Sequence, residues 1–113
     1  MSNILHKIIY ASPYMGRLIG YFNTEMQFKL LEFYKDRKIV NLIRLVKKEV
    51  NFAFYPFEAY NLHSIVTSQN NLDGEIAEVG VYQGGSSKII CEIKGDKKLP
   101  LMYLYYFAEF SSI

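Results

Sequence analysis

The feature that most constrains the fold of this chain is a glycine loop placed between an apolar strand and a helix. Residues 75–81 predict a short strand with Ile76, Val79 and Val81 among its apolar members. The loop after it contains Gly80, Gly84 and Gly85, which have no Cβ atom to obstruct a sharp turn. Such a turn brings a following helix back beside the strand.

A helix and a second strand are predicted after this loop. Ser86 is a natural N-cap for a helix that continues to about Lys94. Residues 99–107 are almost all apolar and predict the second strand. Strand, glycine loop, helix and strand form the opening βαβ unit of a Rossmann-like, doubly wound α/β sheet.

The residues ahead of this unit predict helices. Thr24 and Gln27 have the spacing of a capping box, which predicts a helix beginning there and continuing to about Lys35. Apolar residues at helical spacing predict a second helix over residues 37–50. A third is predicted from Pro56, a residue suited to the first turn, to Thr67.

A stretch rich in Asn, Asp and Gly at residues 69–74 separates these two regions. We therefore expect a helical leader over residues 1–70 and a partial Rossmann-like unit over residues 71–113. The fold class predicted from the sequence is α/β.

Composition excludes several classes of partner. The net charge is only +2 over 113 residues, which gives no electrostatic case for binding nucleic acid. No apolar stretch reaches the roughly 18 residues that a membrane helix needs, so no membrane span is expected. Cys91 is the only cysteine and cannot form an intramolecular disulfide, which suits a cytoplasmic location.

Several isolated side chains are interpreted as structural. Cys91 follows two isoleucines in its helix and is expected to be a small core residue. His63 is expected to be a partly buried helix residue, because no carboxylate partner can be placed beside it. Lys47 and Lys48 are expected to form a solvated face.

The glycine loop also has the properties of a ligand-binding turn. The first N–H groups of the following helix can receive a carboxylate or phosphate. Glu78, two positions before Gly80, can bind a positively charged amine or lie near a sulfonium. The glycine spacing differs from G-x-G-x-x-G, which disfavours a nicotinamide site. A purely structural turn is the alternative.

Residues 72–87, LDGEIAEVGVYQGGSS, resemble the first motif of the macrocin O-methyltransferase family. This family belongs to the class I S-adenosylmethionine-dependent methyltransferases. The resemblance implies an S-adenosylmethionine pocket and a small-molecule or saccharide acceptor methylated on a hydroxyl, with a divalent metal in the complete enzyme. The residues that it implies for the cofactor pocket are Glu78, Gly80, Tyr82, Gly84, Gly85 and Ser86. Gln83 stands where the family commonly has Arg.

The resemblance weakens beyond Pro100. Tyr106 stands where the family has an acid that binds the adenosine ribose, and Glu109 comes three residues later. No residue is assigned as catalytic base or metal ligand. We therefore expect an N-terminal methyltransferase fragment that is inactive alone, with self-association through the exposed edge of the strand at 99–107. The alternative is a small non-enzymatic α/β interaction protein whose glycine loop is only a turn.

Overall fold

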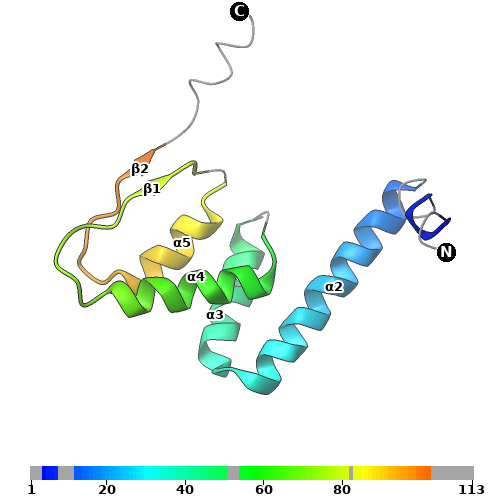
Figure 1. Cartoon of the computed structure of the whole chain (residues 1–113), viewed down its shortest axis with the longest axis horizontal. Coiled ribbons are helices and arrows are strands. Elements are labelled where there is room, and N and C mark those ends of the chain that lie inside the picture. Colours follow the sequence, from blue (N-terminus) through cyan, green and yellow to red (C-terminus); the bar gives the residue numbers. More distant parts are fainter. Residues whose placement is uncertain (1–3, 8–11, 51–53, 82, 103–113) are drawn as a thin grey trace, which may run out of the picture.

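The computed structural model describes residues 4–7, 12–50, 54–81 and 83–102 of the chain. It shows a mixed α/β arrangement in which helices predominate and a short two-stranded parallel sheet follows them (Figure 1). The elements are α2 (Pro13–Tyr34), α3 (Arg37–Glu49), α4 (Pro56–Gln69), β1 (Glu78–Val79), α5 (Gly85–Ile93) and β2 (Leu101–Met102).

The hydrophobic core lies among the helices. In α3 the side chains of Val40, Ile43 and Val46 recur every three residues and are buried on one face, as an amphipathic helix requires. Residues of α2, α4 and α5 meet that face. The core cluster consists of Phe28, Leu31, Val40, Ile43, Val46, Ala59 and Ile89.

An arginine cluster joins α2 to α3 beside this core. The guanidinium of Arg44 donates to Glu25 at 3.1 Å and to Glu32 at 2.9 Å, and it lies 4.2 Å from the centre of the Phe28 ring. Partial burial lowers the pKa of Arg44. Hydrogen bonds to the two carboxylates and their negative charges raise it by more, so the net shift is upward. The cluster therefore remains charged while it covers an aromatic core residue.

The predicted starts of α3 and α4 are confirmed. Asp36 precedes α3 and accepts a hydrogen bond from the Lys38 backbone N–H at 2.8 Å, which satisfies one of the free donors of the first turn. Before α4, the Glu58 carboxylate accepts from the Tyr55 N–H at 2.6 Å, and Pro56 occupies the first helical position. Both helices end within two residues of the predicted boundary.

The predicted start of the first helix is wrong. Thr24 is buried in the interior of α2, which begins eleven residues earlier, at Pro13. The helix is continuous through Thr24, so the backbone groups of the neighbouring residues already have hydrogen-bond partners within α2. The Gln27 side chain instead accepts from the Phe57 backbone N–H at 3.2 Å, and it therefore links α2 to α4.

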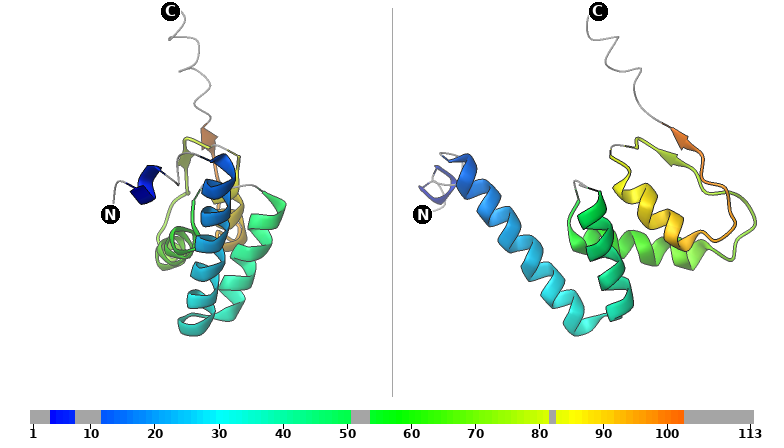
Figure 2. Two further views of the ribbon diagram at one scale, coloured as in Figure 1. Left: turned by 90° about the vertical axis from the view of Figure 1, so that its right-hand side faces the viewer. Right: turned by 180° about the vertical axis from the view of Figure 1, so that it is seen from behind.

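The two strands pair in parallel, with Glu78 opposite Leu101 and Val79 opposite Met102. Hydrogen bonds from the Ile76 N–H to the Lys98 carbonyl and from the Gly80 N–H to the Met102 carbonyl extend the pairing. Both strands are shorter than predicted, and residues 103–107 lie outside the described part of the chain. In Figure 1 and in the right-hand view of Figure 2, α5 lies between the sheet and α4.

Polar contacts hold the turns that lead into the strands. The Asn70 amide, at the end of α4, donates to the Ile93 carbonyl at the end of α5, at 3.2 Å. The Lys97 ammonium donates to the carbonyls of Leu72 and Gly74. The predicted boundary at residue 70 thus falls between elements that share one core, because Ile89 of α5 belongs to the helical cluster.

Among the residues that the structure describes, no helix has the length and hydropathy needed to cross a membrane.

Candidate ligand-binding loop

Glu78 is the central side chain of the candidate site. β1 ends one residue after it, and its carboxylate turns toward the first turn of α5. Its two oxygens each accept a hydroxyl hydrogen bond, one from Ser86 and one from Ser87, the latter at 2.5 Å. The half-buried carboxylate therefore joins the end of the strand to the start of the helix.

The backbone of the loop requires glycine at two positions. Gly80 has φ of 83° and Gly84 has φ of 79°, in the left-handed region that L side chains rarely adopt. A Cβ atom at Gly84 would meet no atom within 4 Å. Conformation, and not crowding, thus demands glycine at Gly84, and the space beside it is open to a ligand.

The predicted N-cap of α5 is wrong. Gly84 is the N-cap, and Ser86 is the second residue of the helix. The Ser86 hydroxyl donates to the Glu78 carboxylate across the loop, so it is turned toward the strand and not toward its own backbone. No side chain caps this helix end.

The start of α5 and the Glu78 carboxylate offer complementary electrostatics. The N–H groups in the first turn of any α-helix have no partner within the helix and bear partial positive charge. Beside them, each Glu78 oxygen accepts one hydroxyl and, as a carboxylate oxygen, has capacity for a second donor. The loop can therefore receive an ammonium group on Glu78 and a carboxylate on the helix start.

Most predicted pocket residues lie together in this region. Glu78 is on β1, Gly80 and Gly84 are in the loop, and Gly85 and Ser86 begin α5. Gly85 is buried, whereas Gly80 is exposed. Tyr82 lies outside the described residues, and Gln83, the position that departs from the family, is exposed.

Sequence reasoning missed the contribution of Ser87. This serine is buried, and its hydroxyl bonds the second oxygen of Glu78. The adjacent pair of serines in a predicted first turn was the available signal. Two consecutive hydroxyls at a helix start can both reach an acidic side chain at the end of the preceding strand.

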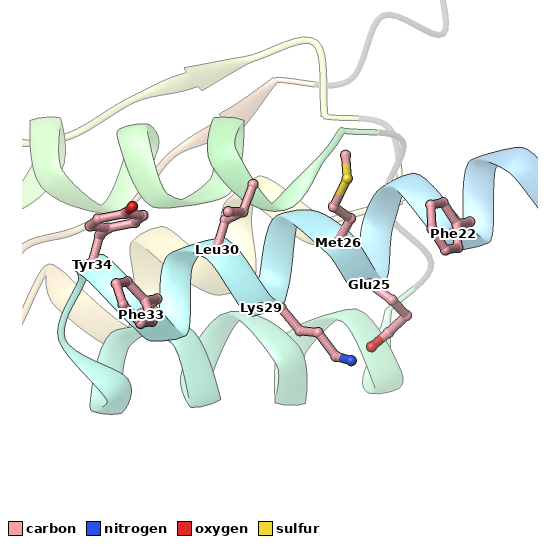
Figure 3. Close-up of a pocket in the computed structure, with 7 residues that line it drawn as sticks. All are labelled: Phe22, Glu25, Met26, Lys29, Leu30, Phe33 and Tyr34. Atoms are coloured by element: carbon pink, nitrogen blue, oxygen red, sulfur yellow. The ribbon is translucent and has the colours of Figure 1, made fainter.

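A cavity that the structure describes lies away from the loop. It has a volume of about 470 Å³ and runs along one face of α2 (Figure 3). Its lining residues are Phe22, Glu25, Met26, Lys29, Leu30, Phe33 and Tyr34. None of them belongs to the glycine loop.

The isolated side chains have mixed outcomes. His63 is half-buried, as predicted, and burial lowers its pKa although the Asp36 carboxylate opposes this. Cys91 is exposed, so the core prediction is wrong, because Ile89 and Ile90 face inward and the helix turns the next residue outward.

The two lysines predicted to form a solvated face differ in exposure. Lys48 is exposed, whereas Lys47 is half-buried, and this burial lowers the pKa of Lys47 despite the negative charge of Glu25. No described cluster of His, Cys, Asp and Glu could hold a metal ion.

Compared with known proteins, the chain has no significant match among protein-family models, curated proteins or solved structures.

Proposed function

We propose that the segment from β1 to α5 binds S-adenosylmethionine as the opening unit of a Rossmann-like O-methyltransferase. The observation behind this proposal is the Glu78 carboxylate, which lies at the carboxyl end of β1 beside the start of α5. In open α/β sheets, ligands bind outside the carboxyl ends of parallel strands. The parallel pairing of β1 with β2 agrees with that arrangement.

The described residues fit the amino-acid portion of this cofactor. Glu78 offers a carboxylate for the ammonium group, and Ser86 and Ser87 hold that carboxylate in place. The first N–H groups of α5 offer positive potential to the cofactor carboxylate. The open space beside Gly84 lets the ligand approach the backbone.

In this function the chain binds and orients the cofactor. When bound, the cofactor supplies a methyl group attached to a sulfonium. Glu78 and the start of α5 fix the amino-acid end, and Gly80 and Gly84 keep the loop backbone in the conformation that leaves room for it. A sugar hydroxyl as acceptor, a divalent metal and a pocket role for Tyr82 rest on the family resemblance alone.

A second candidate is a non-enzymatic interaction protein with a structural glycine turn. It is favoured by the two hydroxyls that already satisfy Glu78 and by the position of the described cavity on α2. The two candidates differ in what removal of the Glu78 charge should do. It should abolish cofactor affinity in the first case and alter only stability in the second.

Isothermal titration calorimetry of the whole chain with S-adenosylmethionine tests the proposal. We expect one site, and we expect Glu78→Gln to weaken binding at least about tenfold, because a charge-assisted hydrogen bond to the ammonium group is lost. Glu75→Gln is the matched control: it removes an exposed carboxylate three residues earlier and should bind like the original chain. Circular dichroism checks that each variant is folded.

Two results would overturn this function. One is the absence of binding by the original chain at about 1 mM cofactor, where even a weak site would be half occupied. The other is equal affinity in the Glu78→Gln and Glu75→Gln variants. A lowered melting temperature of Glu78→Gln without any cofactor affinity in the original chain would establish the structural turn instead.

A further inference from the structure

The outer face of α2 is apolar and has no described neighbour. Phe28 and Leu31 point into the core, but the side chains along the cavity lie on another face of the same helix (Figure 3). Phe22 is 70% exposed and Phe33 is 81% exposed, and Met26 and Leu30 between them are also exposed. A contiguous exposed apolar patch of this kind marks an interaction surface.

A phenylalanine stands toward each end of this face, and both charged residues lie between the two phenylalanines. Its members occupy positions 22, 25, 26, 29, 30, 33 and 34, and a flexible apolar residue, Met26 or Leu30, lies inside each phenylalanine. In an antiparallel pair about a two-fold axis between residues 27 and 28, Phe22 of one copy would lie beside Phe33 of the other, and Met26 would lie beside Lys29 and Glu25 beside Leu30. Self-complementary patches are what a two-fold interface requires.

The charges on the face complement one another across the same axis. Glu25 and Lys29 both line the cavity, and Lys29 forms no ion pair with any residue that the structure describes. In an antiparallel pair, Glu25 of one copy lies within one residue of Lys29 of the other, a shift of about 1.5 Å along the helix. Opposite charges therefore meet twice, and each contact brings a second cation to a Glu25 carboxylate that is already ion-paired with Arg44 of its own copy.

Charge also argues against a membrane surface as the occupant. Within α2, the cations Arg17 and Lys29 equal in number the anions Glu25 and Glu32, so the helix has no net charge. Helices that lie on membranes are typically rich in Lys and Arg on the polar face. The face of α2 lacks that excess.

We propose that this face, Phe22 to Tyr34 of α2, is a homodimer interface in which two copies of the chain pack α2 against α2 in antiparallel orientation. The area agrees with such an interface. An aromatic side chain buries about 150–250 Å² when it is fully covered. The exposed parts of the three aromatic and two aliphatic side chains on this face therefore supply roughly 500 Å² per copy. These residues are Phe22, Met26, Leu30, Phe33 and Tyr34. Two copies supply about 1,000 Å², the lower limit of specific interfaces. The interface does not involve the glycine loop, and the inference stands independently of the proposed function.

Sedimentation equilibrium of the whole chain at about 1–100 µM, the range of a modest interface, is the first test. We expect the mass to rise with concentration from 13.2 kDa toward twice that value. Phe33→Glu should leave a monomer throughout, because it places a charge at a position that is exposed in the single chain. Ile65→Glu, at an exposed apolar position on α4, is the matched control and should dimerise normally.

A charge exchange tests the antiparallel register. Glu25→Lys and Lys29→Glu should each weaken self-association about tenfold or more, since like charges then meet at both contacts. An equimolar mixture of the two variants restores opposite charges at both contacts and should dimerise like the original chain. Should Glu25→Lys fail to fold by circular dichroism, the Phe33→Glu variant and its control still decide the question.

Several outcomes would overturn the inference. They are a monomer at every concentration, a dimer that survives Phe33→Glu, and a mixture of charge variants that does not recover. A dimer that is lost in Met102→Lys but kept in Phe33→Glu would place self-association at the β2 edge instead. Binding to anionic phospholipid vesicles by a chain that stays monomeric would identify α2 as a membrane-surface helix.

Discussion

The helical body and the two-stranded sheet differ in how far their apolar residues are buried. Every member of the core cluster comes from a helix, whereas Val79 of β1 is 67% exposed and Met102 of β2 is 55% exposed. An amphipathic helix needs cover on one face only, and neighbouring helices provide it. A parallel sheet normally needs cover on both faces. The described helices leave β1 and β2 partly uncovered.

Because of this difference, the residues that stabilise the fold and the residues of the candidate binding loop lie in different regions. The helices hold the buried volume, while the glycine loop holds Glu78 and the free end of α5 at the margin of that core. In the described part of the chain, Ile89 on the inner face of α5 belongs to the helical cluster and Ile93 packs against it, and these residues join the loop region to the helices. Changes in the two regions should therefore differ in their effect on the free energy of unfolding.

The largest effect is expected in the helical body. Phe28 is fully buried, and Arg44 stacks on its ring, so Phe28→Ala should lower the free energy of unfolding by about 3–5 kcal/mol through lost burial and a residual cavity. Met102→Ala, on the exposed sheet, should cost less than about 1 kcal/mol. Urea denaturation followed by circular dichroism measures both. Equal costs would show that the sheet is covered in solution and would break the comparison.

A smaller effect, with opposite signs in the two regions, is expected at two glycines. Gly84→Ala should destabilise the chain by about 1–2 kcal/mol, because a Cβ atom is strained at its positive φ. Gly16→Ala, inside α2 where a Cβ meets nothing within 4 Å, should stabilise it by about 0.5–1 kcal/mol. Thermal unfolding compares the two. Stabilisation by Gly84→Ala would mean that the loop adopts another conformation in solution.

Local signals in the sequence predicted the helices that have unambiguous ends. Pro56 begins α4 and was identified as a residue of its first turn, and apolar spacing located α3, although its N-cap Asp36 was not identified. The prediction from the Thr24 pattern was wrong because a capping box forms only at the start of a helix, and α2 begins earlier, at Pro13. Periodicity also cannot say how much of a helix finds a neighbour, so the exposed face of α2 became visible only in the structure.

The candidate site was predicted in location but not in its internal contacts. Glycine and acidic residues at fixed spacing located the loop, because turn geometry is a local property of the chain. The pairing of Ser86 and Ser87 with Glu78 depends on the distance between β1 and α5, which the packing of α5 on the helices determines. For the same reason, sequence alone could not show that Gly84 and not Ser86 caps α5.

The smallest effect is a pH dependence that belongs to the helical body. Burial on α4 lowers the pKa of His63 below the ordinary value of about 6.5, and the Asp36 carboxylate offsets this only in part. The folded chain then binds the proton less readily than the unfolded chain. The free energy of unfolding should therefore fall as pH decreases from about 7 to 5, by less than about 1 kcal/mol, because the side chain is only half-buried. Urea denaturation at several pH values should show that His63→Gln removes this slope, while His6→Gln, at an exposed position, keeps it. A slope that persists in His63→Gln would assign the acid sensitivity to groups outside α4.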